Sequence, residues 1–365
     1  MIKKFFNDIV EFIKEEYKFI IFLLLSVILF LFPVNYYIIV GGDISDIDDR
    51  VIISDSYNSK GSFNISYVSE LKGRLGPYLL SYIIPGWESE SANDYKYVDE
   101  ETIQDIEFRN RLDLVSTNGN AIKWAYELAS KEYKIVDTKV YVISVSDDMP
   151  SNLKIGDRIV KFDDKEIENV NSIREYLGSV SKDEVTITVI RNNKEVNITA
   201  KVYSENGKKL IGVYLQEVSE YETDPDVEIK FKSRESGPSA GLITTLSIYD
   251  KLTEEDLTKG LKIAGTGTIE ADGSIGKIGG VKYKLTGAVK NKADVFLVPS
   301  GDNYEECVKL KRDNKYKIKI IGVSTIEEAI EKLENIDLPN LKLIRMDAIN
   351  IDKVFDKEIN TIYLL

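Results

Sequence analysis

The distribution of hydrophobic and polar residues divides the chain into segments with different periodicities. Residues 19–40 carry no charge, which is typical of a membrane-spanning helix. Residues 50–68 and 139–201 alternate with a period of two, as strands do. Residues 99–134 repeat apolar positions at helical spacing, and strands and helices alternate after residue 211. The pattern therefore predicts one spanning helix and further folded domains of mixed α/β type.

The uncharged segment at 19–40 would be about 33 Å long as a helix, enough to cross a bilayer. Lysine-rich flanks stay in the cytoplasm. We therefore expect residues 1–18 in the cytoplasm, a single pass through the cell membrane at 19–40, and the rest of the chain extracellular. A cleaved signal peptide is the alternative, but no small-residue cleavage site follows the apolar run. The lysines before the segment are Lys3, Lys4, Lys14 and Lys18, and the aspartates just after it are Asp43, Asp46, Asp48 and Asp49, with Arg50 the only basic residue there.

Residues 41–136 are expected to form an extracellular N-terminal region. Strands are predicted at 51–57 and 61–69, and a long helix follows within 99–134. Our hypothesis is that the early strands are the first strands of the last domain, with another domain inserted after them.

Residues 137–205 follow the order strand, turn, strand, helix and a strand hairpin that turns at Asn192-Asn193. This order resembles a PDZ domain. The resemblance implies binding of extended peptides by strand addition, which would assist substrate binding or gate a site; a spacer that binds nothing is the alternative. The Gly-Leu-Gly-Phe loop with which PDZ domains usually bind a peptide carboxylate is not visible, because the matching place at 139–142 reads KVYV. The sequence therefore argues against recognition of a free C-terminus. The residues that carry the resemblance are Leu153, Gly156, Asp157, Ile159, Val160 and the helix at 173–177.

Residues 206–337 read as an α/β domain. Strands such as LKIAGTGTI, ADVFLVPS and KIKIIGV alternate with helices such as VKYKLTGAVKNK and STIEEAIEKL. In the last helix, Ser324 or Thr325 is the predicted cap. Residues 338–365 form a C-terminal extension to which we assign no role.

The amino-acid composition limits which catalytic sites, metal sites and partners are possible. The chain has 365 residues, a net charge of −13, one cysteine and no histidine. The absence of histidine excludes the Ser-His-Asp triad and the HExxH metal site. The single Cys307, expected to be a packed small hydrophobe, excludes an intrachain disulfide and a cysteine-rich zinc site. The acidic balance argues against a nucleic-acid partner, and no G-x-x-x-x-G-K-[ST] loop would bind ATP. We expect no cofactor and no metal.

The stretch RESGPSAGL places Ser239 among small residues, with Gly237 two positions before it. These neighbours would let a substrate backbone approach, and amides at a helix start can stabilise an oxyanion. Ser239 is thus either a nucleophile or an ordinary residue at a helix start, where Ser236 could be the cap and Pro238 the first turn.

A nucleophilic Ser239 needs a proton acceptor, which must be a lysine or a carboxylate in this chain. A lysine acts as a base only when it is neutral, and burial disfavours its charged form. The sequence GTGTIEADGSIGKIGGVKYKL delivers Lys282 and Lys284 from a glycine-rich loop onto the start of a helix.

The combination of SGPSAGL with GGVKYK resembles the proteolytic domain of the Lon family. Together with the PDZ-like segment and the apolar N-terminus, it is similar to the membrane-anchored PDZ-containing Lon-like serine proteases of Gram-positive bacteria. The resemblance implies Ser239 as the nucleophile, Lys284 as the general base and Lys282 as a solvated side chain. Thr266 matches a threonine near the lysine amine, although it can also be an ordinary strand residue. Polypeptide substrates, cleavage without ATP and a homo-hexameric ring are implied as well.

Two other readings remain. Ser69/Lys72, Ser151/Lys154 and Ser179/Lys182 match S-x-x-K, as in penicillin-binding proteins, but no K-T-G or S-D-N accompanies them. The non-enzymatic alternative is a catalytically inactive PDZ scaffold or adaptor at the membrane.

Overall fold

The computed structural model describes residues 2–337, so the predicted extension at 338–365 lies outside the described residues. The chain divides into two compact units, which we describe separately. The first comprises Met1–Gly41 and Val68–Lys96, and the second comprises Gly42–Tyr67 and Tyr97–Leu365. The long strands β1 (Pro33–Asp46) and β3 (Ser62–Arg74) contribute residues to both units.

The first unit contains a long helix and a small strand pair. Helix α1 (Ile2–Leu31) is followed by β1, which pairs antiparallel with β4 (Glu88–Ser91). Helix α2 (Leu75–Ser81) joins the end of β3 to β4, and a 3-10 turn, η1, closes the unit at Ala92–Tyr95. The amide of Leu75 donates to the carbonyl oxygen of Phe32 at 3.0 Å, which joins the start of α2 to the residue after α1.

The predicted membrane-spanning helix at 19–40 is wrong in its second half. Helix α1 ends at Leu31, and Pro33 opens strand β1. Proline lacks the amide that a helix needs and disfavours helical backbone before it, while the β-branched and aromatic residues after it favour a strand. Among the helices within residues 2–337, none is both long enough and apolar enough to cross a membrane.

The second unit is built on a parallel sheet. Strands β16 (Lys319–Val323), β15 (Val295–Pro299), β14 (Lys262–Gly265) and β3 lie in this order, and each neighbouring pair is parallel. All residues of β15 are buried, as expected for a strand with both faces covered. Strand β3 therefore lies in the same sheet as strands more than 190 residues later in the chain.

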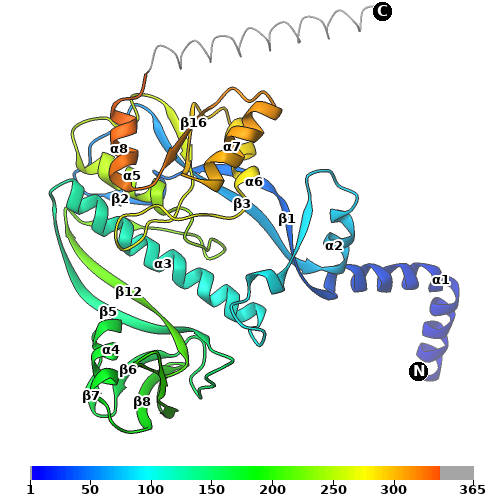
Figure 1. Ribbon diagram of the computed structural model, residues 1–365. Coiled ribbons are helices and arrows are strands. Elements are labelled where there is room, and N and C mark those ends of the chain that lie inside the picture. The colour runs from blue at the N-terminus through cyan, green and yellow to red at the C-terminus, as the bar shows by residue number, and fades with distance from the viewer. Residues whose placement is uncertain (1, 338–365) are drawn as a thin grey trace, which may run out of the picture. The chain divides into compact units, whose positions relative to one another are not determined.

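Helices cover both faces of this sheet (Figure 1). One core contains Phe63, Ile263 and Leu297 of the sheet with residues of α3 (Ile103–Leu128), α5 (Gly241–Leu252) and α8 (Ile326–Glu334). The other core packs Ala264 and Phe296 against α6 (Val281–Lys290) and α7 (Asp302–Asp313). Of the two predicted caps of α8, Thr325 is the one that accepts the amide of Glu328. The short strands β2 (Val51–Ile53) and β13 (Val227–Ile229) pair beside the first core.

The PDZ-like segment forms a separate antiparallel sheet with its own core. Its order is β12-β5-β6-β8-β9, with α4 at Val170–Ser179. The predicted hairpin is confirmed, since Asn192 and Asn193 both have positive φ between β8 and β9. The other bounds are β5 Glu132–Val145, β6 Arg158–Phe162, β7 Lys165–Glu166, β8 Glu184–Arg191, β9 Lys194–Lys201, β10 Tyr203–Glu205, β11 Lys208–Leu210 and β12 Val213–Asp224.

Strand β12 lies in the PDZ-like sheet and not in the sheet of the last domain. The sequence boundary at residue 206 assigned it to the last domain, but it pairs with β5 along its whole length. Together, β5 and β12 form a long ribbon that extends from the PDZ-like sheet along α3 (Figure 1). The KVYV segment at 139–142 lies in β5, between β12 and β6, so it is an inner strand. An added peptide strand would need an edge such as β12 instead.

Candidate active site

Ser239 lies just before helix α5 rather than inside it. The cap residue of α5 is Ala240, and no side chain caps this helix. Ser236 is therefore not the helix cap that the sequence allowed, and Ser239 does not cap the helix either. Ser239 is half-buried, whereas α5 itself is buried on nearly all sides. The serine thus lies at the N-terminal end of a buried helix.

The segment GTGT holds the backbone of Ser239. The carbonyl oxygen of Ser239 accepts the amide of Gly267 at 2.9 Å and the hydroxyl of Thr266 at 3.1 Å. The amide of Leu242 donates back to the carbonyl oxygen of Gly267 at 3.0 Å. A Cβ at Gly267 would lie 2.7 Å from Ile275, so only glycine permits this close contact.

Lys284 reaches the GTGT segment from α6, which packs on the other face of the sheet from α5. It is the fourth residue of α6, which starts after Gly280, a residue with positive φ. The side chain is 4% exposed, and its Nζ donates to Thr266 Oγ1 at 3.2 Å. Thr266 therefore joins the lysine amine to the backbone of Ser239, although these residues are far apart in sequence. Lys282 is half-buried rather than solvated, and its Nζ lies 4.8 Å from the ring centre of Tyr283.

The position of α6 depends on a close backbone approach that sequence reasoning missed. A Cβ built at Gly42 would lie 2.1 Å from the carbonyl oxygen of Tyr283, and one at Gly287 would lie 2.7 Å from the amide of Asp43. The Asn291 side chain donates to Asp43 Oδ1 at 2.6 Å at the end of the same helix. The pair Gly41-Gly42 after a run of β-formers was the available signal.

We expect Gly42→Ala to displace α6 and to lower stability by about 1–3 kcal/mol, as overpacking of a tight contact does. The midpoint of thermal unfolding measures the effect. Gly279→Ala is the matched control, because it lies beside the same helix start with nothing within 4 Å of its Cβ position. Equal midpoints for the two variants would show that the close contact between Gly42 and the Tyr283 carbonyl does not limit the residue at position 42.

Helix α3 contacts the loop of Ser239 from the other side. The amide of Gly237 donates to the carbonyl oxygen of Asn110 at 2.8 Å. Gly237 has φ +86°, a backbone conformation that favours glycine. The buried hydroxyl of Thr117 lies 3.5 Å from the carbonyl oxygen of Pro238. Helix α3 therefore fixes the segment immediately before Ser239.

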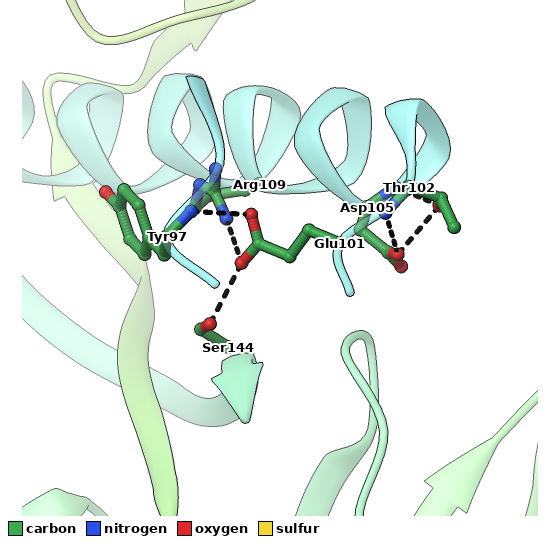
Figure 2. Close-up of polar contacts among 6 residues, drawn as sticks. All are labelled: Tyr97, Glu101, Thr102, Asp105, Arg109 and Ser144. Atoms are coloured by element: carbon green, nitrogen blue, oxygen red, sulfur yellow. Dashed lines mark hydrogen bonds and ion pairs between the residues drawn. The ribbon is translucent and has the colours of Figure 1, made fainter. Parts of the chain in front are cut away.

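The same helix is joined to the PDZ-like sheet by a buried ion pair (Figure 2). Arg109 Nη1 donates to Glu101 Oε1 at 2.8 Å, and both side chains are almost fully buried. Glu101 Oε1 also accepts the hydroxyl of Ser144, on β5, at 2.9 Å. The Arg109 guanidinium lies 3.7 Å from the ring centre of Tyr97, whose amide donates to Glu101 Oε2. These contacts fix the start of α3 to strand β5.

Further along α3, a second polar contact reaches β12. Gln216 Nε2 donates to Asp113 Oδ1 at 3.0 Å. Burial raises the pKa of the Asp113 carboxyl, although this hydrogen bond lowers it in part. Helix α3 thus has polar contacts with β12 and with the loop of Ser239, and it is linked to β5 through Glu101.

We expect Glu101→Gln to weaken the start of α3 by about 3–5 kcal/mol, because it leaves the Arg109 charge buried without its partner. Hydrogen exchange of amides in α3 and β5 measures the local opening. Glu166→Gln is the control, since its ion pair with Lys161 is exposed and should change exchange by about 0.5 kcal/mol or less. Unchanged protection in Glu101→Gln would show that the buried pair does not hold the helix.

The prediction for Cys307 is confirmed. Its side chain is fully buried in the core beside α6, and burial raises the pKa of its thiol to about 12. A thiol with such a pKa stays protonated at neutral pH, as expected for a packed small hydrophobe.

Comparison with known proteins agrees with the two sequence resemblances. Residues 110–202 match the PDZ domain family, and residues 225–335 match the Lon protease (S16) C-terminal proteolytic domain. The solved PDZ domain of an SdrC-like protein from Listeria monocytogenes is 29% identical. It covers 22% of this chain and 92% of that chain, with a TM-score of 0.21.

Curated relatives are Lon proteases. The chain is 27% identical over 160 residues to the Lon protease of Desulfatibacillum aliphaticivorans, covering 40% of this chain and 19% of that protein. It is 33% identical over 94 residues to the Lon protease of Neorickettsia sennetsu, covering 26% of this chain and 11% of that protein. The chain thus spans about a fifth or less of these relatives. It carries a PDZ domain and a Lon-type (S16) proteolytic domain, and it is a distant homologue of Lon proteases.

Proposed function

We propose that the chain is a serine endopeptidase that cleaves polypeptides through Ser239 and Lys284 without ATP. The observation that carries this proposal is the buried contact between Lys284 Nζ and Thr266 Oγ1, whose own hydroxyl donates to the Ser239 carbonyl. An amine shielded from water loses the solvation that favours its charged form. Such an amine beside a serine is the Ser–Lys variant of the catalytic triad.

In the proposed reaction, Ser239 Oγ attacks the carbonyl carbon of the scissile peptide while its proton passes to Lys284 Nζ. The resulting ammonium gives the proton to the leaving amine, and an ester on Ser239 remains. Water then attacks this ester with Lys284 again as the base, which releases the acid and restores the serine. Thr266 orients the amine and does not react itself.

The oxyanion of the intermediate needs two amide donors. Pro238 has no amide hydrogen, and the amides of Gly237, Gly241 and Leu242 donate to other carbonyl oxygens. We assign the role to Ser239 and Ala240, whose amides lie at the start of α5, where the helix dipole favours negative charge.

The PDZ domain would bind substrate segments and influence the active site through α3. Strand β12 is an edge of the PDZ sheet, and α4 lies beside it, with Glu217 of β12 accepting the amide of Val170 at the start of α4. A peptide added along β12 would lie on the ribbon that contacts α3, and α3 bonds to Gly237. The cellular location and the homo-hexameric ring stay predictions.

The test is hydrolysis of fluorescein-labelled casein by the purified full-length chain, with and without ATP. Equal hydrolysis under both conditions, together with labelling of Ser239 by a fluorophosphonate, would support the proposal. Hydrolysis that requires ATP would refute the ATP-independent part. The absence of both hydrolysis and labelling would favour the inactive PDZ scaffold.

A further inference from the structure

Ser66, on strand β3, is a buried hydroxyl that the proposed mechanism does not use. Its side chain is fully buried, and its Oγ has no hydrogen-bond partner among residues 2–337. A buried polar group without a partner is energetically costly, so its presence in a folded protein calls for an explanation.

The register of the sheet places Ser66 beside Thr266. Strands β3 and β14 are parallel, and their last registered pair is Ile65 with Gly265. Ser66 is the next residue of β3, and Thr266 is the residue that follows the end of β14. Neighbouring strands lie about 4.8 Å apart, so continuation of this register puts Ser66 and Thr266 side by side.

Ser66 also faces the side of the sheet that α6 covers. Ala264 packs in the core with Val281 and Leu285 of α6, and Thr266, two residues later, faces the same helix and contacts Lys284. Residues directly beside one another in parallel strands share a face, so Ser66 faces α6 as Thr266 does. Phe63 and Ile65 alternate with it and pack in the opposite core.

We propose that Ser66 is a second positioning residue for the Lys284 amine: its Oγ, unpartnered in the part of the chain that the structure describes, would accept one N–H of that amine, beside Thr266, when Lys284 has taken the serine proton. This inference rests on the proposed function. A protonated lysine has three N–H donors. Thr266 accepts one of them. In the proposed protonated state Ser66 would accept a second, and the third N–H would carry the proton exchanged with Ser239 and the leaving amine. Two acceptors on neighbouring strands would then direct the third N–H of the ammonium toward Ser239 and the leaving amine.

The test compares full-length Ser66→Ala with wild type in casein hydrolysis. We expect kcat to fall about 10-fold with KM unchanged, because the interaction acts on the amine and not on substrate binding. Ser66→Thr, which keeps the hydroxyl and suits a strand, should restore kcat to within about 3-fold of wild type. Ser62→Ala is the matched control on the same face of β3, and it should leave kcat unchanged.

Three outcomes would overturn the inference: wild-type kcat in Ser66→Ala, a loss that Ser66→Thr does not restore, or loss of the folding transition in Ser66→Ala. Ser239→Ala, assayed in parallel, separates this inference from the proposed function. If Ser239→Ala hydrolyses casein as fast as wild type, the proposed function fails. If Ser239 is required while Ser66→Ala keeps wild-type kcat, only the role of Ser66 fails.

Discussion

Ser239→Ala is expected to reduce casein hydrolysis by at least about 10⁴-fold. The substitution removes the nucleophile, and water acting in its place lacks the covalent route. Ser239 is half-buried and its side chain does not cap α5, so the fold should be unaffected. Initial rates at saturating casein measure the loss, and an unchanged thermal midpoint shows that it is not due to unfolding.

Ser236→Ala is the matched control for this variant. It changes the same residue type in the same loop, but Ser236 is exposed and lies three positions before the nucleophile. We expect its rate to stay within about 2-fold of wild type. Comparable rates for Ser239→Ala and wild type would exclude Ser239 as the nucleophile and direct attention to another catalytic group or to the scaffold alternative.

Lys284→Met is expected to lower kcat by about 10³–10⁴-fold. General-base catalysis typically contributes 10²–10⁴-fold, and a thioether cannot accept the serine proton. Methionine has a similar length and fits a site that is 4% exposed beside Leu285 and Val281, so α6 should stay in place. Labelling of Ser239 by a fluorophosphonate should slow in parallel, because the same base activates the serine.

Lys282→Met is the control for the base. Lys282 lies two residues earlier on α6 and contacts the Tyr283 ring, so the variant keeps the helix but changes the other lysine of the motif. We expect less than about 2-fold loss of kcat. The reverse result, with Lys282→Met inactive and Lys284→Met active, would exchange the roles of the two lysines.

Local patterns were sufficient for most single elements. The Asn192-Asn193 hairpin followed from residues that tolerate positive φ, and Thr325 caps α8 through Glu328 as the sequence allowed. The end of α1 did not follow, because an apolar composition suits both a membrane helix and a buried strand. Pro33 and the pairing of Tyr36–Ile39 with β4 decided between the two structures.

Composition and local motifs were enough to limit the catalytic chemistry that this chain can perform. With no histidine, a reactive Ser239 requires a lysine or a carboxylate as base, and GGVKYK offers Lys284 at a helix start. Only the tertiary structure decided which other groups surround that lysine. Thr266 and Ser66 become neighbours because β3 and β14 pair in parallel across nearly 200 residues, and Gly42 lies against Tyr283 across an even longer separation. Parallel pairing and helix packing are set by burial of both faces of a sheet, which no local periodicity records.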